Sequence, residues 1–146
     1  MAAGLRVGVN QKLYRNTGTW ASPVWNEVTI ARDVSLGLSQ SKAEIKARLS
    51  GYAMTLPGIK SAPLEFDILA DTSVDDYNVL RDAFINGTLI GFAVADDAIA
   101  TVGTDYWKGE YYVHGFALDQ KLEDAEMVKV TCDLAYSANV PIWIDV

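Results

Sequence analysis

Alternation of apolar and polar side chains is the strongest pattern in this sequence, and it predicts a mainly β fold. Between residues 26 and 39, nearly every second position is apolar. These positions are Val28, Ile30, Val34, Leu36 and Leu38. A period of two over this length is typical of a half-buried strand. Shorter alternating runs predict further strands at residues 64–68 and 128–134.

Three other segments are expected to be strands for different reasons. Residues 88–95 form a short apolar run, which is typical of a strand buried on both faces. Residues 107–119 are rich in aromatic side chains and long enough for a bent strand with a bulge at Gly115. Val140, Ile142 and Ile144 predict a last short strand after Pro141, at the edge of a sheet.

One segment, residues 73–86, carries the signals of a helix. Val74, Tyr77, Leu80 and Phe84 recur at three- and four-residue spacing. Such a stripe is typical of a helix that packs on a sheet. Ser73 is placed to cap the helix and Gly87 to end it. Acidic residues at positions 75 and 76 favour the positive N-terminal end.

The segment at residues 41–51 is compatible with either a strand or a helix. It alternates from Ala43 to Leu49, but Ser41 and Glu44 also match a capping box, with Gly51 as a stop. We favour the strand, because the preceding strand leads into a polar turn at residues 39–41. The two strands would form a long hairpin. An arm of about ten residues would reach roughly 33 Å, well beyond a compact domain of this size.

The composition changes little along the chain, which indicates a single domain over residues 1–146 with loops at 16–23 and 95–105. The formal net charge is −7, which disfavours tight nucleic-acid binding because such binding depends on Lys and Arg. No apolar stretch approaches the roughly 20 residues of a membrane helix, and residues 1–18 lack the apolar core of a signal peptide. We therefore expect a protein made in the cytoplasm.

The sequence predicts no catalytic, cofactor or metal site. His114 is the one histidine and lies in a strand-like run, and Cys132 alternates with apolar residues as a buried thiol does. Acidic pairs at 75–76, 96–97 and 123–124 match no calcium loop, and we expect them on solvated turns. The four tryptophans are scattered and form no obvious sugar-binding platform.

Several phrases and their order resemble the major tail tube proteins of long-tailed phages and related prophage tubes. Residues 12–23 (KLYRNTGTWASP) precede the alternating run, and residues 33–36 (DVSL) lie within it. Residues 55–58 (TLPG) precede the strand at 64–66, and residues 80–84 (LRDAF) are followed by 86–88 (NGT). The likeness covers residues 10–135, and the order and spacing of these phrases carry it more than any one of them.

The resemblance implies a β-sandwich or barrel-like core with one helix and a long protruding hairpin at residues 34–56. It also implies six copies in a ring, stacked rings, and ring sheets that join into one inner barrel around a channel. The N-terminal segment (about 1–23) and the C-terminal segment (about 137–146) would be interface arms. The expected subunit and ring contacts are Leu36, Leu38, Ile45, Leu49, Tyr52, Ile142 and Ile144.

A structural, non-enzymatic subunit of a hollow virion tail is therefore the expected function, assembled in the host bacterial cytoplasm. Its partners would be its own copies, a tape-measure protein, tail-tip and terminator proteins, and DNA that passes without tight binding. Glu65, Asp67, Asp119 and Asp133 lie in predicted strands, but alternation alone does not say which acids face the channel. Two alternatives stay open: a secretion- or bacteriocin-type tube, and a monomeric carbohydrate-binding β-sandwich.

Overall fold

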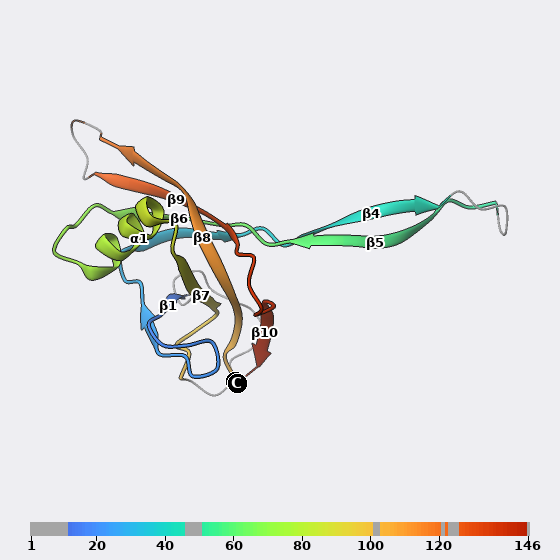
Figure 1. Ribbon diagram of the computed structural model, residues 1–146, viewed down its shortest axis with the longest axis horizontal. Coiled ribbons are helices and arrows are strands. Elements are labelled where there is room, and N and C mark those ends of the chain that lie inside the picture. Colours follow the sequence, from blue (N-terminus) through green and yellow to red (C-terminus); the bar gives the residue numbers. More distant parts are fainter. Residues whose placement is uncertain (1–11, 46–50, 101–102, 121, 123–125, 146) are drawn as a thin grey trace.

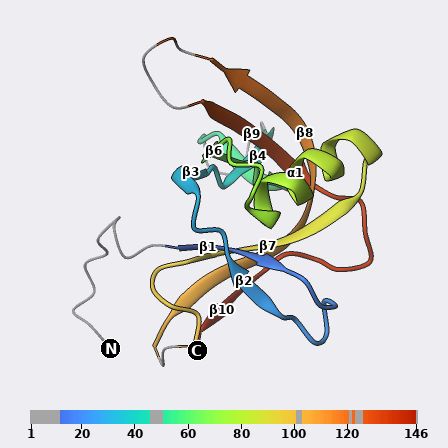
Figure 2. The ribbon, with the colours of Figure 1, turned by 90° about the vertical axis from the view of Figure 1, so that its left-hand side faces the viewer.

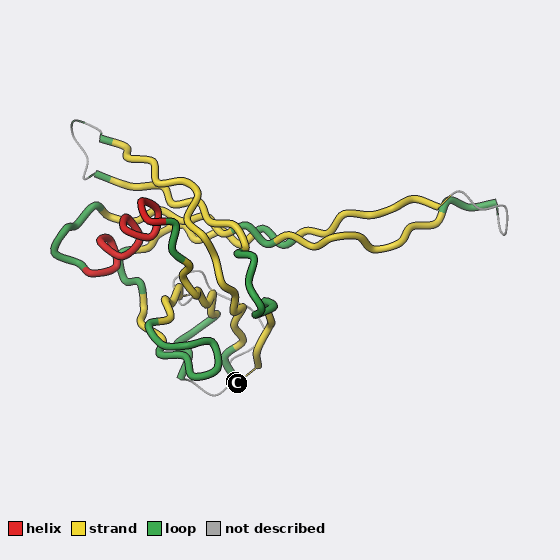
Figure 3. The backbone as a smooth tube through the Cα atoms, viewed as in Figure 1, coloured by secondary structure: helices red, strands yellow, loops and turns green. Residues whose placement is uncertain are grey.

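The computed structural model describes residues 12–45, 51–100, 103–120, 122 and 126–145. Its elements, in chain order, are β1 (Lys12–Asn16), β2 (Trp25–Glu27), β3 (Ala31–Leu36), β4 (Ser39–Ile45), β5 (Met54–Ser61), β6 (Leu64–Leu69), α1 (Asp75–Asn86), β7 (Leu89–Ala95), β8 (Asp105–Asp119), β9 (Met127–Leu134) and β10 (Ile142–Asp145). This mainly β architecture with one helix in the described part confirms the predicted fold class (Figure 3).

The main sheet is antiparallel and curls round on itself. Its strand order is β2-β1-β7-β8-β9-β6-β3, with β10 also paired to β8. The two end strands, β2 and β3, are consecutive in the sequence, and only residues 28–30 separate them. Because so short a connection joins the ends, the sheet must bend into a barrel-like body (Figure 2). Val28 fixes the connection, since its N–H donates to the Leu13 carbonyl at 2.8 Å and its side chain is buried.

The space inside the curled sheet is filled by aromatic and aliphatic side chains. Phe92 lies at the centre and makes edge-on ring contacts with Phe66 and Tyr111, at centroid distances of 5.7 and 6.1 Å. Alternate residues of β6 and β9 complete this core, as the period of two predicted: Leu64, Phe66, Ile68, Val128, Val130 and Cys132. Their polar neighbours point away from the core.

Strand β8 connects the two halves of the sheet and contains the predicted bulge. The register with β9 shifts between Val113 and Gly115. Before the shift Tyr111 and Val113 face the core, and after it Phe116 takes the core position opposite Val130. The bulge therefore changes which alternate residues of β8 point inward. One strand can thus serve both halves of a bent sheet.

The helix α1 packs its apolar stripe onto this core, with two differences from the predicted details. Tyr77, Leu80 and Ala83 are buried, whereas Phe84 is 43% exposed and stacks on Phe116. Gly87 ends the helix in a left-handed conformation, as predicted. Ser73 does not cap it: Val74 is the N-cap residue, and the Ser73 hydroxyl donates to Asp71 instead.

A second, smaller apolar cluster covers the opposite face of β1, β7 and β8. It contains Tyr14, Ala93, Ala95 and Tyr106. The loop at residues 17–24 lies over this face, and buried Lys108 fixes it there by donating to the Trp20 carbonyl at 2.7 Å. Removal from water lowers the pKa of Lys108, and the Trp20 ring, 4.2 Å from the ammonium nitrogen, partly replaces its hydration.

The predicted single strand over residues 26–39 is wrong. The chain turns between β2 and β3, so Val28 and Ile30 enter the core while Val34 and Leu38 are exposed. A second irregularity occurs at Asp33, which has a positive φ of 52° and lies in a bulge between Arg32 and Ser35. The apolar residues of this segment recur at every second position, although the backbone turns at residues 28–30 and bulges between Arg32 and Ser35. The alternation therefore does not correspond to one continuous strand.

The long protruding hairpin is present in the structure, but its strands are not the expected pair. Strand β4 pairs with β5, and residues 39–41 belong to β4 rather than to a turn. The strand interpretation of the ambiguous segment is confirmed for residues 41–45; residues 46–50 lie outside the described part. The TLPG phrase at 55–58 is part of β5. Pro57 and Gly58 are typical turn residues, so the sequence pattern did not predict a strand here.

The β4–β5 hairpin continues a ladder that begins in the body. Leu36 pairs with Leu64, the Gly37 N–H donates to the Pro63 carbonyl at 3.0 Å, and Ser39 pairs with Ser61. Strands β3 and β4 therefore run alongside β6 and β5 as one two-stranded ribbon that leaves the barrel (Figure 1). The seven residues of β4 span about 23 Å at the rise of a strand.

The division between core and ribbon predicts a contrast in stability. Phe66→Ala should lower the free energy of unfolding of the subunit by about 3–5 kcal/mol, because it leaves a cavity beside Phe92. Ile59→Ala should change it by less than about 0.5 kcal/mol, because Ile59 is 85% exposed on the hairpin. Urea unfolding of the unassembled subunit measures both. Equal losses would contradict the assignment of Ile59 to an unpacked arm.

Candidate assembly interface

The hairpin is the most exposed regular element of the described chain. Every residue of β4 and β5 is exposed, although the two strands carry several large apolar side chains. Their exposed fractions are 41% for Ile45, 49% for Met54, 53% for Leu56 and 85% for Ile59. A two-stranded hairpin without packing partners is marginal in water. Contiguous apolar surface of this kind is typical of an interaction site.

The apolar residues of the outer hairpin share one face. Ala43 lies opposite Leu56 and Ile45 opposite Met54, and directly opposed residues project to the same side. Their neighbours Lys42, Glu44 and Thr55 project to the other side. We call the set Ala43, Ile45, Met54 and Leu56 the apolar hairpin face. It is a continuous strip two side chains wide.

A bulge separates this face from the base of the hairpin. The register shifts between Gln40 and Lys42, and the Ile59 N–H donates to the Ser41 hydroxyl at 2.9 Å. A Cβ atom at Gly58 would lie 2.3 Å from the Ser41 hydroxyl oxygen and 3.0 Å from its carbonyl oxygen. Glycine is therefore required where the two backbones approach each other. The bulge increases the twist of the hairpin at this point.

The body of the subunit leaves several sheet edges open in the part that the structure describes, and the outer sides of β2 and β10 are among them. Two others lie on β3 and β8. Strand β3 pairs with β6 alone. Residues 113–118 of β8 pair with β9 alone, because the ladder with β7 ends at Tyr112 and the ladder with β10 covers Asp105 to Lys108. These edges flank a four-stranded unit in the order β8-β9-β6-β3. Unpaired edges of this kind bind further strands readily.

The outward face of this four-stranded unit is polar and rich in acids. The four acids whose direction the sequence left open all lie on it: Glu65, Asp67, Asp119 and Asp133. We call this surface the acidic face. Two basic residues, Arg32 and Lys129, lie among the acids, and Lys129 is 3.9 Å from Glu65. Both partners of that ion pair are about half exposed, so it contributes little stability.

The residues expected at subunit contacts fall into three groups. Leu38, Ile45, Tyr52 and Ile142 are exposed, with fractions of 53, 41, 76 and 44%. Leu36 and Ile144 are partly buried against the two apolar clusters of their own subunit, because they take inward positions opposite Leu64 and Tyr106. Leu49 lies outside the described residues.

The two expected arms differ in a similar way. Residues 1–11 lie outside the described part. Strand β1 lies inside the main sheet between β2 and β7, so residues 12–16 belong to the body of the subunit rather than to an arm. At the other end β10 pairs with β8, and Val140 and Ile142 before and within it are exposed. Met54, Leu56 and Ile59 were not among the expected contacts, because the sequence pattern did not predict β5.

The residues that could perform chemistry are accounted for by local structure. His114 is exposed beside the Tyr112 ring, 6.4 Å away between centroids. Asp76 was expected on a solvated turn but is buried in the first turn of α1, where it accepts from Arg15 at 3.0 Å. Asp96 and Asp97 accept backbone N–H groups of Asp105 and Ala98, and the acidic pair at 123–124 lies outside the described residues. No group of three or more metal-ligating side chains occurs among the described residues. In the same part of the chain, no helix is long and apolar enough to cross a membrane.

Comparison with known proteins identifies the fold. No protein-family model matches the sequence, and no curated protein does. Solved structures do match. The SPP1 tail tube has a TM-score of 0.73 at 14% identity, covering 97% of this chain and 80% of the other. The tail of an empty gene transfer agent particle, refined with C6 symmetry, has a TM-score of 0.71 at 13% identity, covering 91% and 96%.

A third match extends the comparison to contractile systems. The PVC sheath–tube complex of an extracellular contractile injection system has a TM-score of 0.66 at 11% identity, covering 98% of this chain and 93% of the other. These likenesses span 91–98% of the chain. The chain therefore has the tail tube fold, as the resemblance of its phrases implied.

The burial of Cys132 predicts that its thiol reacts slowly. Burial raises the pKa of Cys132 to about 12, and its side chain is 0% exposed. In the folded subunit at pH 9.5, Cys132 should therefore react with a thiol reagent at least a hundred-fold more slowly than an exposed cysteine, which is largely ionised there. A Thr55→Cys variant supplies the exposed cysteine in the same molecule. Equal labelling of both cysteines would contradict the buried, unreactive assignment.

Proposed function

We propose that this protein is a structural subunit that assembles head to tail into rings, and that the rings stack into a hollow tail tube through which DNA passes. The observation that carries the proposal is the four-stranded unit with two open edges and one acidic face. The likeness to assembled tail tubes supports it. The described residues also supply no constellation for catalysis, and we propose a non-enzymatic role.

Ring closure follows from the direction of the strands. Neighbouring strands in β8-β9-β6-β3 are antiparallel, so β3 and β8 run in opposite directions. If a rotated copy places its β8 edge beside β3, the new pair is antiparallel as well. A unit with an even number of strands can therefore continue round a ring without a break. Head-to-tail contacts that close by rotation produce rings, and six copies would form a barrel of 24 strands.

The acidic face would then line the channel. It is the uncovered side of the four-stranded unit, whereas the corresponding side of β1 and β7 lies under the 17–24 loop. Its acids outnumber its two basic residues, so DNA phosphates would meet like charge along the wall. Glu65, Asp67, Asp119 and Asp133 are the acids we assign to the lumen. Repulsion of this kind allows passage without tight binding.

Stacking is assigned to the hairpin and the C-terminal segment. The hairpin projects from the body, and its apolar face has no packing partner among the described residues of its own subunit. Burying a fully exposed Leu, Ile or Met side chain contributes about 1.5–3 kcal/mol, and the half-exposed Ile45, Met54 and Leu56 would each contribute roughly half of this. Several such residues for each subunit, repeated round a ring, would hold neighbouring rings together. Leu38, Ile45, Tyr52 and Ile142 keep their expected place in this interface.

The remaining partners and the location follow from the same proposal. The tube would sit in a virion tail, after assembly in the cytoplasm of a bacterial host. A tape-measure protein inside it, and tail-tip and terminator proteins at its ends, are the partners such a tube requires. A tube of a contractile injection system is the second candidate, favoured by the match to the PVC sheath–tube complex. The two candidates share their assembly and differ in what passes through the channel.

Negative-stain electron microscopy of the purified protein over a concentration series tests the proposal. Hollow rings or tubes of uniform diameter are expected. The double variant Ile45→Asp, Met54→Asp should remain a folded subunit and form no tubes, because it places charge on the apolar hairpin face. The matched control Lys42→Asp, Thr55→Asp changes the opposite face and should assemble. A wild-type monomer that persists at high concentration, even with tail-tip components, and that binds saccharides would contradict the proposal.

Hydrogen exchange tests the ring contact separately. On assembly, backbone amides of β3 and of residues 113–118 should exchange at least ten-fold more slowly, because their free edge groups become paired between copies. Amides of β7, which is already paired on both sides, supply the internal reference. Tubes in which the β3 and β8 edges keep the exchange rates of the free subunit would rule out the continuous barrel.

A further inference from the structure

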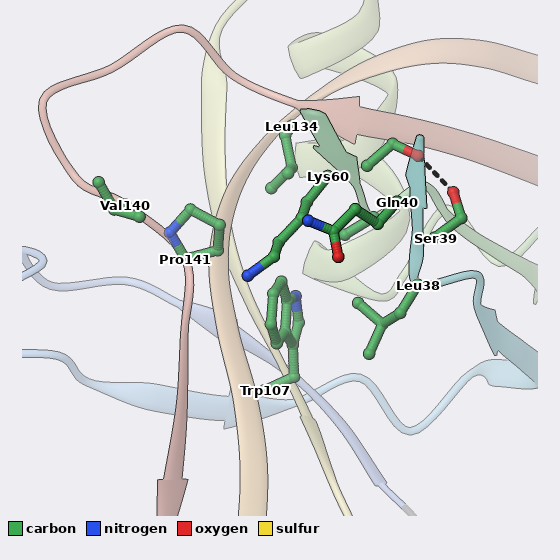
Figure 4. Close-up of a pocket in the computed structure, with 10 residues that line it drawn as sticks. Leu38, Ser39, Gln40, Lys60, Trp107, Leu134, Val140 and Pro141 are labelled. Carbon is green, nitrogen blue, oxygen red and sulfur yellow. Dashed lines mark hydrogen bonds between the residues drawn. The ribbon is translucent and has the colours of Figure 1, made fainter. Parts of the chain in front are cut away.

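A cleft of about 660 Å³ lies where the hairpin leaves the body. Leu38, Gln40 and Lys60 form one wall at the base of the hairpin. Trp107, Leu134, Val140 and Pro141 form the other, from β8, the end of β9 and the segment before β10 (Figure 4). Its size is within the range of about 300–1,000 Å³ that is typical of pockets for groups as large as several side chains.

Apart from the Lys60 ammonium group, the polar side chains of the cleft walls already bind partners within the subunit. The Trp107 indole N–H donates to the Tyr111 hydroxyl at 2.9 Å, which leaves the ring as apolar surface. The Ser39 and Ser61 hydroxyls bind each other at 2.6 Å, and the Gln40 amide donates to the Gly58 carbonyl at 3.2 Å. An occupant therefore gains little from hydrogen bonds to these groups. Apolar side chains suit the cleft best.

The charge of the surroundings also restricts the occupant. The chain has a net charge of −7, so two copies repel each other across most of their surface. The cleft has no carboxylate among its lining residues, and Lys60 supplies its one charge. The apolar hairpin face has no charged member. These two surfaces are therefore places where copies of an acidic chain can meet without bringing acids together.

The two surfaces cannot meet within one molecule. The cleft lies at the base of the hairpin, beside Ser39 and Ser61, whereas the apolar hairpin face lies beyond the bulge on the outer half of the same two strands. A stiff two-stranded ribbon cannot fold back onto its own base. Contact between them therefore requires a second molecule. One chain that carries both a projecting face and its receptor repeats the contact indefinitely.

We propose that the cleft receives the apolar hairpin face of a second copy, with Met54 and Leu56 against Trp107, Leu134 and Val140. This inference rests on the proposed function, because it assigns the receptor for the hairpin in the assembled tube. The base of each hairpin then forms part of the site that receives the next one. Each copy is both donor and receptor.

A cysteine cross-link between two variants tests the contact. One chain carries Leu56→Cys and the other Val140→Cys; both positions are exposed, at 53 and 72%, and native Cys132 is buried. The two chains are mixed, assembled, oxidised and separated on a non-reducing gel. A disulfide-linked dimer is expected in tubes and not in unassembled subunits. Thr55→Cys in place of Leu56→Cys is the matched control. It lies one residue away on the opposite face and should give at least ten-fold less dimer.

The outcomes separate this inference from the proposed function. Tubes that form without the Leu56–Val140 dimer, or with as much dimer from the Thr55 control, overturn the cleft assignment while the tube remains. A wild-type protein that forms no tubes overturns both. If the cysteine variants do not assemble, wild-type tubes are oxidised with peroxide instead. Met54, 49% exposed in the subunit, should then oxidise at least ten-fold more slowly than in free subunits. An unchanged rate overturns the assignment.

Discussion

The structure depends on one constraint: β2 and β3, the strands at the two ends of the main sheet, follow each other directly in the sequence. Because residues 28–30 must join β2 to β3, the sheet cannot stay open and has to enclose its apolar side chains. Enclosure defines the core around Phe66, Phe92 and Tyr111. It also turns the alternate, acidic side chains of β6 and β9 outward. The bulge at Gly115 allows β8 to follow this bend and to place Phe116 against the core.

The isolated subunit does not stabilise all of its parts, because some strand edges and the hairpin lack partners within the described residues. Curling joins β2 to β3 covalently but not by a hydrogen-bonded ladder, so the outer sides of β2 and β3 remain open. The far part of β8 is open because its ladder with β7 ends at Tyr112. The ribbon then carries the β3–β6 ladder away from the body, where its side chains have only solvent around them. Open edges and exposed apolar strips are normally hazards. In a repeating assembly they become the contacts.

Much of the fold could be predicted from the sequence because most of its strands alternate simply. The core positions of β6 and β9, the buried strand β7, the bulged β8 and the final β10 all follow from such patterns. The failures have a common physical cause. At residues 26–39 the apolar residues alternate throughout, but a turn and a bulge point some of them into the core and others to solvent. In β5 the Pro57-Gly58 pair resembled a turn, although here it accommodates a bulge against Ser41.

The candidate site was harder to predict than the fold, for a related reason. Exposed apolar residues of an assembly surface follow the same period as core residues, so Leu36 and Leu38 looked alike until the structure separated them. The direction of the acids depended on the curvature of the sheet, which alternation does not specify. The alternation within a strand also does not show which distant strand it pairs with.

In the proposed tube, four strands from each copy form a continuous channel wall. Electron cryomicroscopy of assembled tubes, at a resolution that separates strands, tests it most directly. We expect an inner barrel in which β3 of one copy pairs with β8 of the next, with Glu65, Asp67, Asp119 and Asp133 facing the lumen. Tubes whose channel is lined by another surface, or whose subunits meet without pairing these two strands, would contradict it.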